Sequence, residues 1–123
     1  MKLRLENNSL RLRVRKSDLQ KLQQDGSVIE TLSFPNAAIF QYALTTNAVD
    51  AAIVATFSDN KIVVNVPLSM ATDWVNSDEV GLETRLESGL SILVEKDFPC
   101  KDRPWEDTKD TFFELVSEEA AIC

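Results

Sequence analysis

The chain has 123 residues, a net charge of −7 and no histidine. A chain of this length can bury one hydrophobic core without disulfides, and its hydrophobic content of 44% excludes a disordered protein. The lack of histidine excludes Ser-His-Asp triads, Cys-His dyads and histidine-ligated zinc. Catalysis would have to rest on carboxylates, lysine, tyrosine or a lone thiol. We expect one globular domain over residues 1–123.

The composition also predicts where the protein works. No apolar run approaches the roughly 20 residues of a membrane helix, and the first residues alternate leucine with lysine or arginine, unlike a signal peptide. The two cysteines, Cys100 and Cys123, fit free thiols in a reducing compartment. We therefore expect a soluble cytoplasmic protein without membrane contact.

Charge is distributed unevenly along the chain. Residues 1–21 hold seven cations and two acids, a local charge of +5, which leaves −12 for the remainder. A basic segment on an acidic body affects the choice of binding partners more than the fold.

The first predicted element is a basic hairpin. Residues Lys2 to Glu6 and Leu10 to Arg15 alternate apolar with basic side chains, and Asn7-Asn8 suits a tight turn. The alternation predicts an outward basic face of Lys2, Arg4, Arg11, Arg13 and Arg15. A short helix from about Asp18 to Gln24 should follow, with Ser17 and Gln20 as a capping box and Gly26 as its stop.

Two further strand pairs are predicted in the middle of the chain. Residues 28–34 and 39–44 alternate apolar with polar side chains on either side of Pro35-Asn36. Asp59-Asn60 is a hairpin turn signal. A turn centred there predicts the apolar cross-strand pairs Phe57 with Ile62, Ala55 with Val64, and Ile53 with Val66.

A second helix and a last hairpin follow. Pro67 suits the start of a helix over Leu68 to Val75. Apolar residues at 80–86 and 90–94 then flank Glu87-Ser88-Gly89, a three-residue hairpin loop with glycine at the left-handed position. Because Ile92, Leu93 and Val94 are continuously apolar, the strand from Leu90 to Val94 should lie at the centre of a sheet.

Beyond this hairpin the chain changes character. Prolines at 99 and 104 exclude regular structure between them, and residues 105–123 read as an acidic C-terminal helix or tail. We detect no internal repeat. The pattern predicts the α+β class, with a largely antiparallel, strongly curved sheet of about eight strands in hairpins and two or three short helices.

The late segment carries a resemblance. Its motif is Val94-Glu95-Lys96-Asp97-Phe98, then Cys100, Arg103, Glu106-Asp107 and Asp110. This motif and the basic opening resemble a family of small uncharacterised bacterial proteins, a domain of unknown function. The family's ending of Phe-Pro-Asn-Pro is replaced here by Phe112-Phe113-Glu114-Leu115. The resemblance covers most of the chain and implies no activity.

The same segment holds the candidate binding cluster, consisting of Lys96, Asp97, Cys100, Arg103, Glu106, Asp107 and Asp110. The cluster could be an ion network in which Arg103 pairs with Asp97 or Glu106, or it could hold an anionic ligand. Cys100 could be a reactive thiol or a small packed side chain. The late acids could ligate a divalent cation, but helix-dipole stabilisation is favoured, so we expect no metal and no cofactor.

Three functional hypotheses follow. We prefer a non-enzymatic binding or interaction domain whose partner is unknown, with a second copy or another protein as candidates. The first alternative is a DNA-binding dimer that uses the basic hairpin, as in swapped-hairpin regulators. The second is a carboxylate-based or metal-assisted enzyme at residues 95–110. Because residues 106–119 supply six acids against one lysine, we expect the protein's own acids, rather than nucleic acid, to neutralise the basic face.

Overall fold

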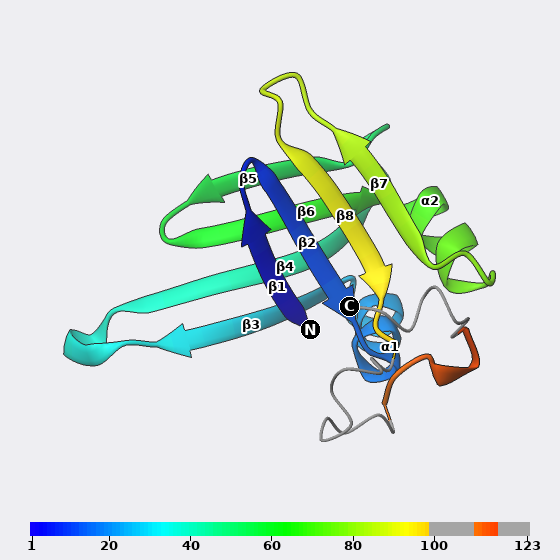
Figure 1. Ribbon diagram of the computed structural model, residues 1–123, viewed down its shortest axis with the longest axis horizontal. Coiled ribbons are helices and arrows are strands. Elements are labelled where there is room, and N and C mark those ends of the chain that lie inside the picture. The colour runs from blue at the N-terminus through cyan, green and yellow to red at the C-terminus, as the bar shows by residue number, and fades with distance from the viewer. Residues whose placement is uncertain (99–109, 116–123) are drawn as a thin grey trace. The chain divides into compact units, whose positions relative to one another are not determined.

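The structure is a computed structural model in which residues 1–98 and 110–115 are described (Figure 1). The first half of the chain contains β1 (Lys2–Glu6), β2 (Ser9–Val14), α1 (Lys16–Asp25), β3 (Ser27–Ser33), the 3-10 turn η1 (Pro35–Ala37) and β4 (Ile39–Asn47). The second half contains β5 (Val54–Ser58), β6 (Lys61–Pro67), α2 (Leu68–Val75), β7 (Gly81–Arg85), β8 (Ser91–Lys96) and the 3-10 turn η2 (Phe113–Leu115).

The eight strands form two sheets. Sheet A has the order β1-β2-β8-β7, and sheet B has the order β3-β4-β6-β5. The α+β class and the four antiparallel hairpins are confirmed, but the predicted single curved sheet of about eight strands is wrong. The hairpins join in pairs through two parallel contacts, β2 with β8 and β4 with β6. Turn residues specify a hairpin, but they carry no information about which hairpin it meets later.

The two sheets repeat one topology. The elements β1, β2 and α1 begin at residues 2, 9 and 16, and β5, β6 and α2 begin at 54, 61 and 68, a constant separation of 52 residues. The chain is thus a ββαββ arrangement used twice, and each sheet takes one hairpin from each half. This repeat corrects the expectation that the sequence contains none. Few equivalent positions carry the same amino acid in the two halves, so sequence identity alone did not reveal the repeat.

The buried positions follow the repeat. Leu10, Leu12 and Val14 on β2 are buried, as are the residues 52 positions later, Ile62, Val64 and Val66 on β6. The helix positions correspond in the same way, with Leu19 and Leu22 matched by Ala71 and Trp74. An apolar stripe at alternate strand positions followed by one helical face is the pattern that a ββα unit needs to bury one side.

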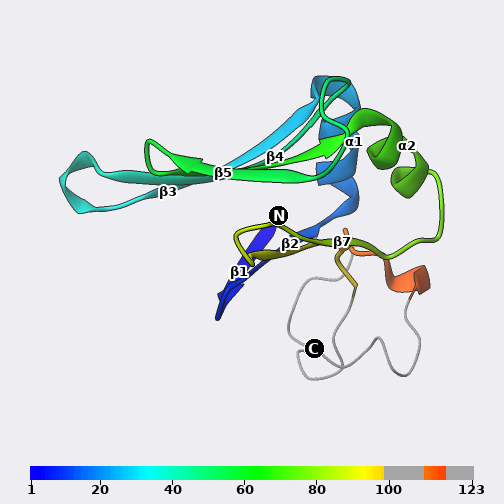
Figure 2. The ribbon, with the colours of Figure 1, turned by 90° about the horizontal axis from the view of Figure 1, so that it is seen from above.

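The structure divides into two compact units, residues 1–19 with 77–123, and residues 20–76. Sheet A belongs to the first unit and sheet B to the second. Figure 2 shows sheet B with the β3–β4 and β5–β6 turns at one end and α2 at the other. The prediction of one domain over residues 1–123 stays a prediction.

The predicted turns and registers are largely confirmed. Asn7, Asp59, Asn60 and Gly89 have the positive φ that their turns require. Phe57 pairs with Ile62 and Ala55 with Val64, as expected. The expected pair of Ile53 with Val66 is absent from the described ladder, because β5 begins only at Val54.

The helices agree with the predictions in part. The second helix spans Leu68–Val75 as predicted, whereas α1 begins at Lys16, two residues early. The carboxylate of Asp18 accepts a hydrogen bond of 2.8 Å from the backbone N–H of Arg15. At the start of α1, Asp18 therefore makes the side-chain to backbone contact that was predicted for Ser17 and Gln20. The predicted C-terminal helix lies mainly outside the described residues, which contribute only η2 there. No described helix has the length and apolarity to cross a membrane.

Candidate functional site

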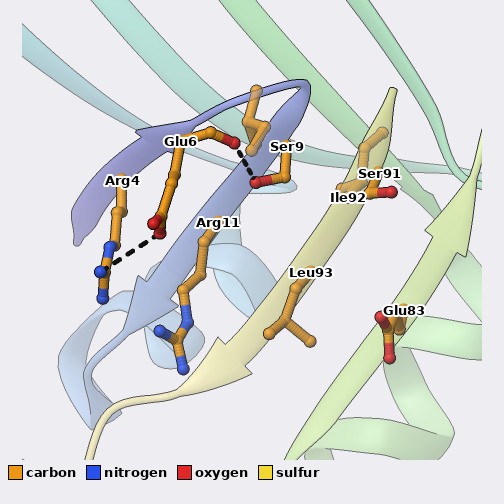
Figure 3. A pocket seen from close by; sticks show the side chains of 9 residues that line it. Arg4, Glu6, Ser9, Arg11, Glu83, Ser91, Ile92 and Leu93 are labelled. Carbon is orange, nitrogen blue, oxygen red and sulfur yellow. Dashed lines mark hydrogen bonds and ion pairs between the residues drawn. The ribbon is translucent and has the colours of Figure 1, made fainter. Parts of the chain in front are cut away.

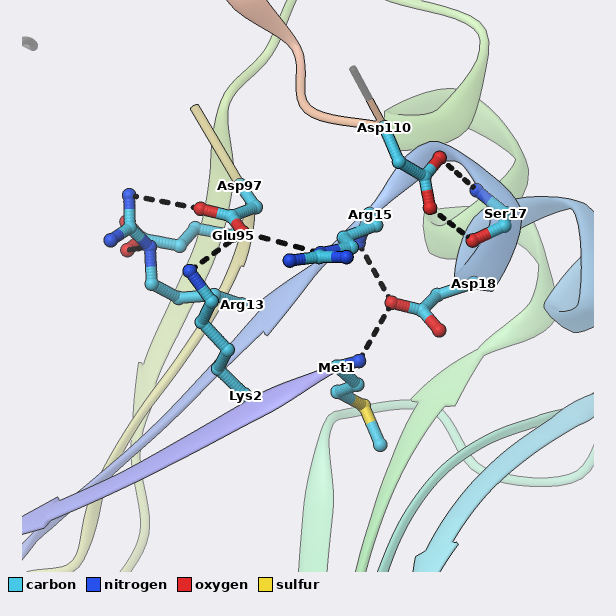
Figure 4. A network of polar contacts seen from close by, with 9 residues as sticks. All are labelled: Met1, Lys2, Arg13, Arg15, Ser17, Asp18, Glu95, Asp97 and Asp110. Atoms are coloured by element: carbon cyan, nitrogen blue, oxygen red, sulfur yellow. Dashed lines mark hydrogen bonds and ion pairs between the residues drawn. The ribbon is translucent and has the colours of Figure 1, made fainter. Parts of the chain in front are cut away.

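Charged side chains gather on one face of sheet A, at the ends of β2 and β8. Alternation along β1, β2 and β8 brings together Lys2, Arg11, Arg13, Arg15, Glu95 and Asp97, which we call the charged cluster. Figure 4 shows all of them except Arg11. The parallel register sets Arg13 opposite Glu95. Acids and bases that lie far apart in the sequence therefore meet on one face.

Glu95 is shared by two arginines. Its Oε1 lies 2.6 Å from Arg11 Nε and 3.0 Å from Arg13 Nε, and the residue is only 5% exposed. Neither Nε–H is aligned for a hydrogen bond within the described residues, so the attraction here is between charges. Gly81 stands opposite Glu95 on β7, and a Cβ at that position would lie 3.3 Å from Glu95 Cβ. It would also lie 3.2 Å from Leu93 Cδ1, so a glycine at this position avoids tight contacts between β7 and β8.

Asp97 lies within ion-pair distance of three cations, and its backbone makes two hydrogen bonds. It is 1% exposed, with Lys2 Nζ at 3.2 Å, Arg13 Nη2 at 3.6 Å and Arg15 Nε at 3.9 Å from its carboxylate oxygens. Its backbone N–H donates to Val14, and its carbonyl accepts from Phe112. Asp97 therefore fixes the end of β8 from both sides.

The predicted basic face is only partly a surface. Arg13 was expected to point into solvent, but it is 8% exposed, with its guanidinium 4.6 Å from the centre of the Phe98 ring. The hairpin alone would expose Arg13. The parallel neighbour β8 brings Glu95 alongside it, and Phe98 covers it. Lys2, Arg11 and Arg15 remain about one third exposed, and Arg4 pairs with Glu6 at 3.3 Å.

Lys96 lies on the opposite side of β8 from the two acids. It is 2% exposed, its ammonium group donates to the Ser77 carbonyl at 2.6 Å, and Phe112 lies 5.6 Å away. Burial lowers the pKa of Lys96, an effect opposed by the nearby carboxylates of Asp78, Glu79 and Glu114. Lys96 and Asp97, adjacent in the predicted binding cluster, thus serve separate contacts.

Asp110 caps helix α1. Its carboxylate accepts hydrogen bonds from the hydroxyl and the backbone N–H of Ser17, and its carbonyl accepts from the backbone of Lys16 (Figure 4). The bond from the Ser17 hydroxyl is the main reason that the pKa of Asp110 is lowered. Asp18 in the same turn pairs with the amino group of Met1 at 3.0 Å. Acids at a helix start complement its dipole.

The remaining predicted residues are less informative. Cys100, Arg103, Glu106 and Asp107 lie outside the described residues, so the expected Arg103 ion pair stays a prediction. Within residues 110–115, Glu114 pairs with Lys16 at 3.1 Å. A hydrogen bond from its own backbone N–H is the main reason that the pKa of Glu114 is lowered. Among the described residues, the arginines of β2 pair with Glu95 on β8 and with Asp97 just after it. Residues 106–119, which were expected to supply these acids, lie mostly outside the described residues, so that expectation stays a prediction.

A shallow hollow lies beside the charged cluster. It has a volume of about 250 Å³ and is lined by Arg4, Glu6, Arg11, Glu83 and Leu93, among others (Figure 3). The charged groups on its walls are of both signs, and Arg4 and Glu6 pair with each other. In the part of the chain that the structure describes, no acids or thiols gather in a group of three that could hold a metal ion.

Sheet B carries a feature that the sequence analysis missed. Five side chains share one face near its turn end and form what we call the apolar face: Leu32, Phe40, Tyr42, Phe57 and Ile62. Leu32 is 42% exposed and Phe57 is 66% exposed, and Phe34, just past β3, is 51% exposed. The sequence analysis predicted the hairpins of this sheet but no exposed apolar face on them. The parallel β4–β6 register places Tyr42 opposite Ile62 and so brings the apolar residues of the two hairpins onto one face.

Together these features define an α+β protein with two mixed four-stranded sheets, an ion-paired charged cluster and a partly exposed apolar face. The chain belongs to DUF7009, a family of unknown function, whose model matches residues 1–114. No curated protein and no solved structure matches the chain. Membership of a family of unknown function was predicted and is confirmed, whereas a bacterial origin and the late motif stay predictions.

Proposed function

We propose that this chain is a non-catalytic, cytoplasmic interaction domain that contacts another polypeptide through the apolar face of sheet B. The observation that carries the proposal is the exposure of Leu32 and Phe57 on one continuous face with Phe40 and Tyr42. Contiguous apolar patches on soluble proteins mark interaction sites, and aromatic side chains are enriched at the centres of interfaces.

The state of the buried acids argues against the enzyme alternative. A general acid or base must reach its substrate, yet Glu95 and Asp97 are 5% and 1% exposed and surrounded by cations. These acids therefore serve the fold of sheet A.

The state of the basic residues argues against the DNA alternative. Arg13 is buried, and Lys2, Arg11 and Arg15 each lie within ion-pair distance of a carboxylate. Phosphate contacts would have to displace these pairs on a chain of net charge −7.

A titration with random-sequence duplex at low salt separates these hypotheses. We expect no salt-dependent binding by the intact chain. Binding that weakens linearly with the logarithm of salt concentration would contradict the proposal, because it reports released counterions.

The apolar face can be tested with anilinonaphthalene sulfonate, a dye that fluoresces on apolar surfaces. We expect the folded chain to enhance dye fluorescence and the double variant Leu32→Ser, Phe40→Ser to lose most of that enhancement. Val49→Ser is the matched control, since Val49 is 89% exposed but lies outside the face. No enhancement by the folded wild-type chain, or an equal loss in the control, would refute the proposal.

A further inference from the structure

Strand β5 is an edge strand without the usual protection. It pairs with β6 on one side and, among the described residues, with no strand on the other. Its sequence, Val-Ala-Thr-Phe-Ser, contains no charge and no proline. The other three edge strands all carry charge, with Lys2, Arg4 and Glu6 on β1, Glu30 on β3, and Glu83 and Arg85 on β7.

An uncharged edge is an open template for strand addition. Alternate residues of an antiparallel strand direct their N–H and C=O groups away from the partner, so β5 presents a row of backbone groups beyond β6. Its side chains are exposed as well, with Phe57 at 66% and Val54 at 38%. Proteins usually block such an edge with lysine or proline unless a strand covers it.

We propose that β5 of a second copy of this chain pairs antiparallel with β5 about a two-fold axis at Thr56. The two copies of sheet B would then form one continuous eight-stranded sheet. The inference rests on the proposed function, since Phe57 belongs both to β5 and to the apolar face, which the second copy would extend.

The strand is complementary to itself in this register. Thr56 lies opposite Thr56 of the second copy, a favourable cross-strand pair. Phe57 lies opposite Ala55 of the second copy, so the larger side chain meets the smaller one on both sides of the axis. The two Phe57 rings become diagonal neighbours, about 7–8 Å apart and within reach of each other.

Charge also favours a second copy. The remaining pair of the five-residue strand, Val54 with Ser58 of the second copy, is uncharged, so no like charges face each other despite the net charge of −7. A two-fold interface requires one patch to match itself, and β5 meets that condition along its whole length.

Sedimentation velocity over a range of concentrations tests the inference. The molar mass obtained for the wild-type chain should be twice the 13.8 kDa of one copy. Thr56→Lys should weaken the dimer by about tenfold or more, because two introduced ammonium groups would face each other across the axis. Thr31→Lys, at an exposed threonine on the other edge strand of sheet B, should leave the dimer unchanged.

A charge-pair rescue guards against a variant that simply misfolds. Thr56→Asp alone should also be monomeric, and an equimolar mixture with Thr56→Lys should regain dimer mass. A monomeric wild-type chain, or a dimer that Thr56→Lys leaves intact, would overturn this inference. Dye binding at the apolar face that persists in a monomer would leave the proposed function standing, and its loss would remove both.

Discussion

Three consecutive residues, 95–97, and Arg13 on the neighbouring strand show how far a local pattern can be trusted. The sequence analysis ended the strand at Val94 and so placed Glu95, Lys96 and Asp97 just after it. All three are at most 5% exposed, like Ile92 and Val94 within the strand. Arg13 was read as an outward cation and is buried beside them. Alternation correctly placed Arg13 on one face of the hairpin with Arg11 and Arg15. It could not predict that charges of opposite sign would cover one another across a parallel strand pair.

Glu95 is the residue on which the charged cluster most depends. Replacing it by glutamine removes the negative charge that lies 2.6 Å from Arg11 Nε and 3.0 Å from Nε of the buried Arg13. Removing one member of a buried ion pair typically costs about 3–5 kcal/mol, because the remaining charge stays desolvated. Urea unfolding of Glu95→Gln should show a loss of that size. The control is Glu83→Gln on the exposed face of neighbouring β7, which should change stability little.

A cost below about 1 kcal/mol for Glu95→Gln would mean that the two arginines find other partners or reach water. The charged cluster would then be a surface feature available to ligands, and the anionic-ligand hypothesis for it would regain weight.

At the scale of single elements, β8 confirms its predicted place. It lies between β2 and β7, with Ile92 and Val94 completely buried. Continuous apolar character predicted a central strand, and only a central strand has neighbours on both edges.

Ile92→Ala therefore removes side-chain atoms from a packed site and should lower the free energy of unfolding by about 2–5 kcal/mol. Leu93→Ala is the matched comparison, since Leu93 is only partly buried and points to the other face. A denaturant titration should rank the two losses in that order. A near-neutral Ile92→Ala would contradict the placement of β8 in the core.

Helix α1 depends on a residue far from it in sequence. The sequence analysis sought its cap nearby, at Ser17 and Gln20, because capping patterns are local. The cap that the structure adds is Asp110, whose carboxylate receives both donors of Ser17. A contact across 93 residues leaves no local signal, so it could not be predicted from one sequence.

Asp110→Asn should destabilise the protein at neutral pH, and the difference from wild type should depend on pH. The pKa of Asp110 is lower in the folded state than its ordinary value of 3.8, so its stabilising effect is present above that value. The effect is lost as pH falls through the folded-state pKa. Urea midpoints across the acid range should therefore converge for the two proteins below about pH 3.8.

Asp73→Asn, an exposed change on α2, should show no comparable convergence. A pH-independent difference between Asp110→Asn and wild type would assign the effect of that change to shape rather than charge.

At the scale of the whole molecule, the sequence predicted four hairpins and the helices between them, but not how the hairpins combine. Local turns such as Asp59-Asn60 and Gly89 define hairpins through their backbone conformation. The parallel contacts of β2 with β8 and β4 with β6 are between strands separated by long connections. A polar pair lies at each of these parallel contacts. Arg13 pairs with Glu95 in sheet A, and the part-buried Thr45 donates a hydrogen bond to Asn65 in sheet B.

The intertwined repeat has a consequence for folding. Residues 1–51 contain one hairpin of each sheet, and residues 52–123 contain the other hairpin of each. Neither half can complete a four-stranded sheet, and an isolated two-stranded hairpin is marginally stable at best. Each half expressed alone should therefore lack cooperative unfolding, and mixing the halves should restore the circular dichroism spectrum of the intact chain.

The matched control is the full chain cleaved at an engineered protease site between Ala51 and Ala52, in the exposed loop before β5. Cleavage there breaks no strand, and the two halves stay joined through the parallel β2–β8 and β4–β6 contacts, so the cleaved protein should keep its native spectrum. Cooperative unfolding by either half alone would show that a ββαββ unit closes on itself. The repeat would then be two independent modules that exchange hairpins only when they share one chain.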